Sequence, residues 1–393
     1  MKVAGLFSGI GGLELGMAAA GHDSLLLCES WSPAQAVLRA RFPEMPIEPD
    51  VVDLVGLPGE TDVVVAGFPC QDLSQAGMTA GIRGARSGLV GHVFRLLDLQ
   101  PVPWVVLENV SFMLHLDRGR AMQTLVEAFE ERGYRWAYRI VNSLAFLPQR
   151  RERVLFVATR SDVDPAGVLF MDDSVPRNAE VSLSTHAHGF YWTEGLRGLG
   201  WAQDAIPPLK NGSTVGIASP PAIVLPNGAV ITPDIRDAER LQGFDAGWTE
   251  PAGSVGREAL RWSLIGNAVT VPVAKWLGAQ LAAPGHYEVE RDRELSEGDR
   301  WPRAARFDGK RRMRVEIGSF PVWQDRSPLA AFLRFEGKPL SARATRGFLS
   351  RTERGTLRFV PGFLELLRSH LSMTEAGIRP SERSIERQGM AIE

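Results

Sequence analysis

The chain of 393 residues lacks the features that mark secreted, membrane-bound or metal-rich proteins. It contains only two cysteines, Cys28 and Cys70, which cannot build a disulfide framework, so we expect it to work in the reducing cytoplasm. No Cys/His cluster has the spacing of a zinc site, and we expect no metal. No apolar run is long enough to span a bilayer, and the N-terminus begins directly with a predicted strand instead of a signal peptide. We therefore expect no membrane partner.

The sequence also lacks a strong excess of charge of either sign. Its formal net charge is −2, whereas a protein that coats nucleic acid without selectivity would be more basic. Two local basic clusters stand out, QRRER at 149–153 and KRRMR at 310–314. Each can be a solvated charged face or a phosphate-binding patch, so the net charge does not exclude an enzyme that acts on DNA.

Apolar runs alternate with amphipathic segments over the first 160 residues. Strands are predicted at KVAGLF, DSLLLCE, TDVVVAGF and WVVLENV, each followed by a segment with helical spacing. This alternation predicts an α/β fold with a doubly wound, mostly parallel sheet. We divide the chain into a catalytic domain at 1–160, an insertion rich in Gly, Pro and Ser at 161–234, a return to the first domain at 235–285, and an extension of unknown role at 286–393.

Ligands of open α/β sheets bind beyond the carboxyl ends of the strands, and several polar features fall there. FSGIGG at 7–12 is a Gly-rich turn that lets backbone amides approach a ligand closely. Its glycine spacing is not that of a dinucleotide-binding turn, which argues against a nicotinamide oxidoreductase. Glu29 ends the second strand and can accept two ribose hydroxyls, while Asp50 is placed to reach an adenine edge. Either acid alone can equally be a helix cap or a solvated carboxylate.

The stretch GFPCQDLS places a cysteine where a buried strand ends. Pro69 forces Phe68 into an extended conformation, so the Cys70 thiol sits at a strand-to-helix junction. There the helix dipole and free amides can lower the pKa of a thiol below its usual value of about 8.5. Cys28, in an apolar strand, instead has the setting of an inert core residue.

An acid and two cations complete the set of reactive side chains. Glu108, in ENV, ends the fourth strand, where partial burial can raise its pKa and let it donate a proton. Arg151 and Arg153 lie two apart where a later strand begins, so we expect both to point to one face. Together with a thiol, these groups suit an anionic or electron-rich ring as the substrate.

In this order the motifs resemble those of the DNA cytosine-5 methyltransferases of the bacterial restriction–modification type. GLFSGIGGLELG is similar to the motif that holds S-adenosylmethionine, GFPCQDLS to the nucleophile motif, ENV to the Glu motif and QRRERV to the Arg motif. RDAERLQGF at 236–244 resembles the motif that supports the recognition domain, and GNAV at 266–269 resembles the motif that closes the cofactor pocket. Together the six motifs cover roughly the first 285 residues.

The resemblance implies a reaction in which the Cys70 thiolate adds to carbon 6 of a flipped-out cytosine and makes carbon 5 nucleophilic. Glu108 would bind N3 and the exocyclic amine, and Arg151 and Arg153 would orient the ring. The implied substrate is a specific short sequence of double-stranded DNA. Ser30 stands where the family often has a bulky residue beside the ribose acid. The implied cofactor shell for S-adenosylmethionine consists of Phe7, Gly9, Gly11, Gly12, Glu29, Asp50, Pro69, Leu89, Asn267 and Val269.

Two readings compete with this one. An RNA cytosine-5 methyltransferase acting on tRNA has the same architecture, but that branch usually lacks a sizeable insertion such as 161–234, the implied target-recognition domain. A catalytically inactive DNA-binding relative would not need an intact set of catalytic residues, and this sequence retains Cys70, Glu108, Arg151 and Arg153. We expect a monomer, and a restriction endonuclease that acts on the same site is a candidate partner without a stable complex. The arginines after residue 285 suit phosphate contacts and packing on the catalytic domain equally well.

Overall fold

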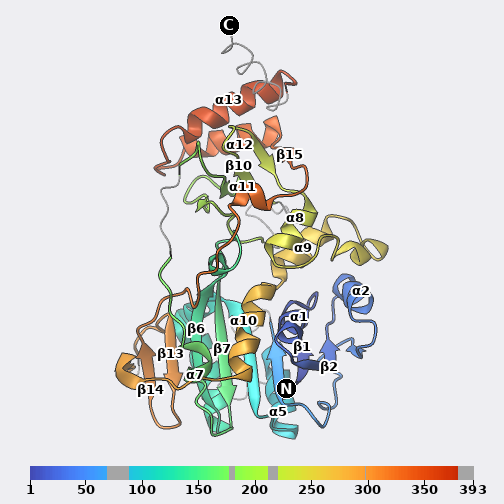
Figure 1. Cartoon of the computed structure of the whole chain (residues 1–393), viewed down its shortest axis with the longest axis vertical. Helices are drawn as coiled ribbons and strands as arrows, with labels where there is room; N and C mark the ends of the chain where they lie inside the picture. Colours follow the sequence, from blue (N-terminus) through green and yellow to red (C-terminus); the bar gives the residue numbers. More distant parts are fainter. Residues whose placement is uncertain (69–87, 177–181, 211–219, 297, 379–393) are drawn as a thin grey trace.

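The computed structural model describes residues 1–68, 88–176, 182–210, 220–296 and 298–378, and these form a large and a small β-sheet. In Figure 1 the large sheet occupies the lower part of the molecule, and the small sheet lies above it, next to helices α12 and α13. Among the described residues, no helix is long and apolar enough to cross a membrane.

The parallel half of the large sheet is built around β1 (Lys2–Leu6), which pairs with β2 on one side and β4 on the other. Its strands are short apolar runs, such as the fully buried VVVA of β4, and this is typical of strands covered by helices on both faces. The strand order in this half is β3 (Ile47–Glu48), β2 (Asp23–Cys28), β1, β4 (Val63–Ala66) and β5 (Trp104–Val110).

The other half of the sheet is antiparallel. There β7 (Glu152–Thr159) lies between β5 and β6 (Arg135–Asn142) and runs against both. Beyond β6 follow three more antiparallel strands: β13 (Ala304–Phe307), β14 (Arg312–Val315) and β12 (Asp292–Glu294). The predicted doubly wound α/β class is confirmed. The antiparallel share is nevertheless larger than predicted, because residues 292–315 cover the edge of β6.

Helices cover both faces of the large sheet. On one face, α1 packs tightly against α10, since a Cβ on Gly16 would lie only 2.3 Å from the Cβ of Ala274. The apolar residues of each face form a separate core cluster. One face carries α1 (Gly12–Ala19), α7 (Ala166–Leu169) and α10 (Val271–Ala282), and the other carries α5 (Leu89–Leu99) and α6 (Arg120–Glu131).

The small sheet is assembled from segments that are far apart in the sequence. Its strand order is β15 (Lys338–Pro339), β11 (Val230–Thr232), β10 (Ala222–Val224), β8 (His188–Phe190) and β9 (Ala202–Gln203). One face shares a core cluster with α2 (Ser32–Arg41), α8 (Ile235–Leu241), α9 (Leu260–Asn267) and α11 (Leu329–Phe332). The opposite face is covered by α12 (Ala342–Glu353) and α13 (Phe363–Glu375).

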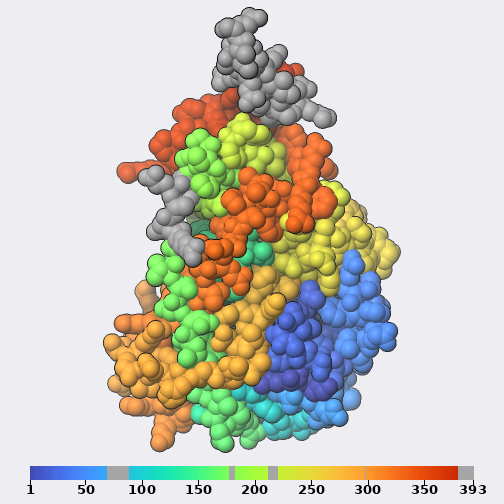
Figure 2. All heavy atoms as spheres, in the orientation of Figure 1, coloured from blue at the N-terminus to red at the C-terminus, as the bar shows by residue number. Residues whose placement is uncertain are grey.

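The predicted extension after residue 285 is therefore divided between the two sheets. Its first part supplies β12–β14 of the large sheet, and its second part supplies α11, β15, α12 and α13 of the small one. Figure 2 shows the orange segment after β14 on the surface between the lower and upper parts of the molecule. Nothing in the composition of the extension marks this division.

Candidate functional site

The Gly-rich turn after β1 has an unusual backbone. Phe7, Gly9 and Gly11 all have positive φ angles, of 55°, 56° and 83°. A positive φ is costly for a phenylalanine, and such strain is found where surrounding structure enforces it. Gly12 has a different constraint, since a Cβ there would lie 2.6 Å from the carbonyl oxygen of Val269. The turn thus brings Val269, of GNAV, directly onto the N-terminus of α1.

Glu29 holds this turn against the end of β2. Its Oε2 accepts a hydrogen bond from the amide of Gly9 at 2.8 Å, and its Oε1 accepts one from the amide of Trp31 at 2.8 Å. Burial raises the pKa of the Glu29 carboxyl, and the backbone hydrogen bonds oppose this effect. Asp50 lies two residues beyond β3, half-buried, and its Oδ1 accepts the amide of Val52 at 2.9 Å. Both predicted acids lie at the same edge of the sheet, because β2 and β3 are parallel neighbours.

A buried carboxyl group that the sequence did not single out lies behind the turn. Glu14 of α1 is fully buried, and within the described residues neither of its oxygens nor the Ser8 hydroxyl makes a hydrogen bond of normal geometry. Burial raises the pKa of Glu14 to about 7. A Cβ on Gly5 would lie 2.2 Å from Glu14 Oε1, so the glycine provides the space for this carboxyl. Unpartnered buried polar atoms of this kind call for a functional explanation.

Glu108 lies where β4 and β5 end side by side. Its Oε2 would be 3.8 Å from a Cβ on Gly67, the residue that follows β4. Arg153 Nε lies 3.1 Å from Glu108 Oε1, and Glu108 is buried while Arg153 is largely buried. Burial raises the pKa of the Glu108 carboxyl, while the charges of Arg153 and Arg151 lower it. The predicted acid and one predicted cation are therefore in contact.

Asn109 contacts the end of the predicted nucleophile strand, although sequence reasoning assigned it no role. It is buried, and its Nδ2 donates to the carbonyl of Phe68 at 3.0 Å, two residues before Cys70. Glu108 and Asn109 together fix the end of β4 on two sides. The position of Asn109 in ENV, directly after Glu108, was the signal in the sequence that could have identified it. Cys70 and Pro69 themselves lie outside the described residues.

Arg151 has a different environment from Arg153. Its Nη1 donates to the carbonyl of Leu209 at 3.0 Å, and its Nη2 donates to the carbonyls of Gly266 and Ala268 at 3.2 and 2.8 Å. Burial lowers its pKa to about 9, so it stays charged at neutral pH. In this arrangement Arg151 supports the GNAV segment and the chain leading out of the small sheet.

Gln149, in the same basic motif, was also missed. Its Oε1 accepts the amide of Leu209 at 3.1 Å, and its Nε2 donates to Leu241 and Gln242 at the end of α8 at 2.8 and 3.1 Å. The segment 149–153 therefore connects Glu108, the small sheet and α8. Of the remaining predicted shell residues, Leu89 is half-buried at the start of α5, and Asn267 is exposed at the end of α9.

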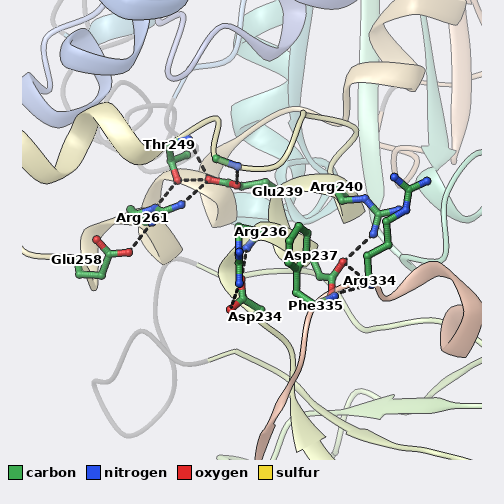
Figure 3. A network of polar contacts seen from close by, with 11 residues as sticks. Asp234, Arg236, Asp237, Glu239, Arg240, Thr249, Glu258, Arg261, Arg334 and Phe335 are labelled. Atoms are coloured by element: carbon green, nitrogen blue, oxygen red, sulfur yellow. Dashed lines mark hydrogen bonds and ion pairs between the residues drawn. The ribbon is translucent and has the colours of Figure 1, made fainter.

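Two buried carboxylates on α8, in the RDAERLQGF motif, accept hydrogen bonds from chain segments on either side of the helix (Figure 3). Glu239 accepts hydrogen bonds from the amides of Gly247 and Thr249 and from Arg261 Nη2, at 2.5, 2.9 and 3.0 Å. Asp237 points to the other side, where it accepts the amides of Arg334 and Phe335. One helix thus fixes both the chain before α9 and the chain before β15.

Comparisons with known proteins identify the family of this chain. The family model for C-5 cytosine-specific DNA methylase matches residues 1–193. The chain is 46% identical over 369 residues to the type II methyltransferase M2.BsuMI of Bacillus subtilis (strain 168), covering 91% of this chain and 94% of the relative. It is 25% identical over 315 residues to M.DsaV of Dactylococcopsis salina, covering 72% and 86%. A solved structure of S. pombe Dnmt2 methyltransferase aligns at 15% identity with a TM-score of 0.49, covering 72% of this chain and 97% of that one.

The chain therefore belongs to the C-5 cytosine-specific DNA methylases and is a DNA (cytosine-5-)-methyltransferase, as the order of its motifs predicts.

Proposed function

We propose that this enzyme transfers a methyl group from S-adenosylmethionine to carbon 5 of a flipped-out cytosine in a short, specific duplex sequence. The observation that carries the proposal is the place of Glu108, beside Gly67 at the end of β4 and in contact with Arg153. The chain reaches Cys70 three residues after Gly67. The role of Cys70 itself rests on the GFPCQDLS motif.

The residues around the Gly-rich turn suit S-adenosylmethionine chemically. A Cβ on Gly9 would meet no atom within 4 Å, which leaves open space in front of the turn. Glu29 keeps its carboxylate at that turn and would accept the ribose hydroxyls, with Asp50 on the adenine side. The unpartnered Ser8 hydroxyl and Glu14 carboxyl lie directly behind the same turn. When bound there, the cofactor would supply an electrophilic methyl group.

The protein groups would then act on the cytosine ring in sequence. The Cys70 thiolate would add to carbon 6, and the electron pair of the double bond between carbons 5 and 6 would shift to form a double bond between carbons 4 and 5. The electron pair released from the double bond between carbon 4 and N3 would take the proton of Glu108 at N3, which leaves an enamine that is nucleophilic at carbon 5. Burial favours the protonated form of Glu108 that this step needs. After carbon 5 has accepted the methyl group, a base would remove the proton from carbon 5, and the double bond between carbons 5 and 6 would re-form as the Cys70 thiolate leaves carbon 6. The proton on N3 would return to the Glu108 carboxylate. The target base must first leave the duplex, at a cost of a few kcal/mol.

We also propose that the enzyme is the modification half of a restriction–modification system in the cytoplasm, acting as a monomer. The support is the likeness to bacterial type II methyltransferases over most of the chain. A cognate endonuclease would act on the same DNA sequence and would not need a stable complex with this protein.

The test is methyl transfer from labelled S-adenosylmethionine to duplex DNA, with tRNA as the competing substrate. We expect label in 5-methylcytosine of DNA only. Duplexes carrying 5-fluorocytosine should remain covalently attached to the wild-type protein, because the fluorine cannot be removed as a proton is. Labelled tRNA with unlabelled DNA, or label without any covalent trapping, would contradict the proposal.

A further inference from the structure

The last part of the chain is built into the small sheet. β15 pairs with β11, where Pro339 lies opposite Ile231, and Asp237 accepts the amides of Arg334 and Phe335 shortly before β15 (Figure 3). On the outer face, the rings of Phe348 and Phe363 lie 5.2 and 5.1 Å from that of Phe190 in β8. Helices α12 and α13 therefore belong to the same unit as β8 and the loop that follows it.

That loop, residues 191–199, is held in shape by α12. It closes on itself through hydrogen bonds from Tyr191 to Leu199 at 2.7 Å and from Gly195 to Gly198 at 2.8 Å. Arg351 of α12 donates from Nη2 to the carbonyl of Trp192 at 2.6 Å and from Nε to that of Glu194 at 2.9 Å. A single side chain of the extension thus fixes the first half of the loop.

The base of the same loop lies beside the catalytic arginines. Lys210 Nζ sits 3.6 Å from the centre of the Tyr191 ring and forms a 2.6 Å ion pair with Glu194. The Tyr191 hydroxyl donates to the carbonyl of Pro208 at 2.6 Å, and the carbonyl of the next residue, Leu209, accepts a hydrogen bond from Arg151 Nη1 at 3.0 Å. The loop therefore runs from the surroundings of Arg151 to the end of α12.

This surface is rich in cations, and although Arg346 pairs with Glu375, two exposed arginines have no acidic partner among the described residues. The segment 342–358 contains five arginines and one glutamate. Arg197, near the tip of the loop, and Arg354, at the end of α12, are exposed, and neither forms an ion pair with any residue in the described ranges. The nearby Gly355 would place a Cβ 2.9 Å from the carbonyl of Leu196, so the end of α12 and the loop tip are in contact.

We propose that loop 191–199 and the end of α12 form one DNA-binding surface, in which Arg197 and Arg354 contact backbone phosphates and Arg351 positions the loop. This inference rests on the proposed function, in that the substrate is duplex DNA. Cations held on a rigid support beside the site of base flipping are suited to phosphates, and phosphate contacts set the position of a protein on the duplex.

The test measures binding of a cognate duplex by fluorescence anisotropy over a series of salt concentrations. Each of Arg197→Gln and Arg354→Gln should reduce the slope of log K against log salt by about one. Arg351→Ala should raise the KM for DNA while kcat at saturating DNA stays close to wild type, and Arg351→Lys should restore only part of the affinity. Affinity for S-adenosylmethionine should not change in any of these variants.

The matched control is Arg314→Gln, on β14 of the large sheet. Arg314 is also partly exposed, but it is paired with Asp299 at 3.0 Å, so its removal should leave the salt slope unchanged. If Arg351→Ala fails to fold, the salt slopes of Arg197→Gln and Arg354→Gln still test the proposal. Unchanged slopes in an enzyme that methylates DNA would overturn this inference alone, whereas a wild-type protein that methylates no DNA would overturn the proposed function.

Discussion

The two sheets of this enzyme are built in opposite ways. The parallel half of the large sheet comes from one continuous stretch, Lys2 to Val110, and its strand ends carry the Gly-rich turn, Glu29, Asp50 and Glu108. The small sheet collects strands from 188–232 and from 338–339, and two helices beyond them. The predicted site residues at these strand ends thus come from one continuous stretch of sequence. The surface proposed to contact DNA depends instead on contacts between distant segments.

The largest effect is expected from Cys70→Ser, which should abolish the reaction without disturbing the small sheet. A hydroxyl in place of the thiol would be a far poorer nucleophile, so methyl transfer should fall by more than about 10³-fold. Binding of S-adenosylmethionine and of DNA should remain, as measured by calorimetry and anisotropy. Substantial residual turnover would show that the nucleophile lies elsewhere.

Asp237→Ala should have the opposite selectivity, because it acts on the small sheet and leaves the cofactor site of the large sheet intact. It removes the acceptor for the amides of Arg334 and Phe335 and for Arg240 Nη1, all buried or half-buried, at a cost of about 3–5 kcal/mol. We expect weaker DNA binding and faster limited proteolysis between α11 and α12, with cofactor affinity retained.

The control for this variant is Asp234→Ala on the same helix. Asp234 caps α8 through the amide of Arg236 at 2.9 Å and is partly exposed, so its loss should cost only about 1 kcal/mol. Equal proteolysis of the two variants would mean that Asp237 has no special role in holding the extension.

A smaller effect, dependent on pH, is expected at Glu14 of the large sheet. Its pKa rises from an ordinary value of 4.5 to about 7 in the folded protein. The stability that it contributes is therefore fully present below pH 4.5 and is lost as the pH rises through 7, by about 3 kcal/mol at 1.36 kcal/mol per pKa unit. In urea unfolding at pH 5 and pH 8, Glu14→Gln should remove this loss, and it should be more stable than wild type at pH 8. A pH dependence identical to that of wild type would contradict the burial of a neutral carboxyl.

The smallest effect is expected from Cys28→Ala, at the end of β2. This thiol is buried, and burial raises its pKa to about 12, so it is not a thiolate at neutral pH. We expect unchanged kcat and a loss of stability below about 1.5 kcal/mol. Iodoacetamide should not label Cys28 in the folded wild-type enzyme, and rapid labelling there would show that β2 is less well packed than the structure indicates.

The sequence was sufficient to predict the parts of the site that depend on strand ends. Glu29 and Glu108 could be placed at one edge of the sheet because alternation brings the carboxyl ends of parallel strands together. Arg153 was expected only at the start of a later strand, and it reaches Glu108 because that strand, β7, runs antiparallel to β5. The contacts of Arg151 and Arg351 could not be predicted, because both arginines bind backbone carbonyls, which every residue possesses and no motif marks.

The division of the extension was hidden for a related reason. β15 has only two residues, too few for any periodic pattern, and its partner in β11 lies more than a hundred residues earlier. The KRRMR cluster likewise gave no sign that its arginines would be used within the large sheet, where Arg312 pairs with Glu130 and Arg314 with Asp299.

The late position of α12 and α13 in the chain has a consequence for biosynthesis. Phe190 and Val224 emerge from the ribosome well before Phe348 and Phe363, which cover them. Until α12 and α13 have been synthesised, one side of that small sheet stays uncovered and open to unwanted association. A messenger truncated near its 3′ end would therefore yield a polypeptide whose catalytic strands are complete and whose upper half is prone to aggregate.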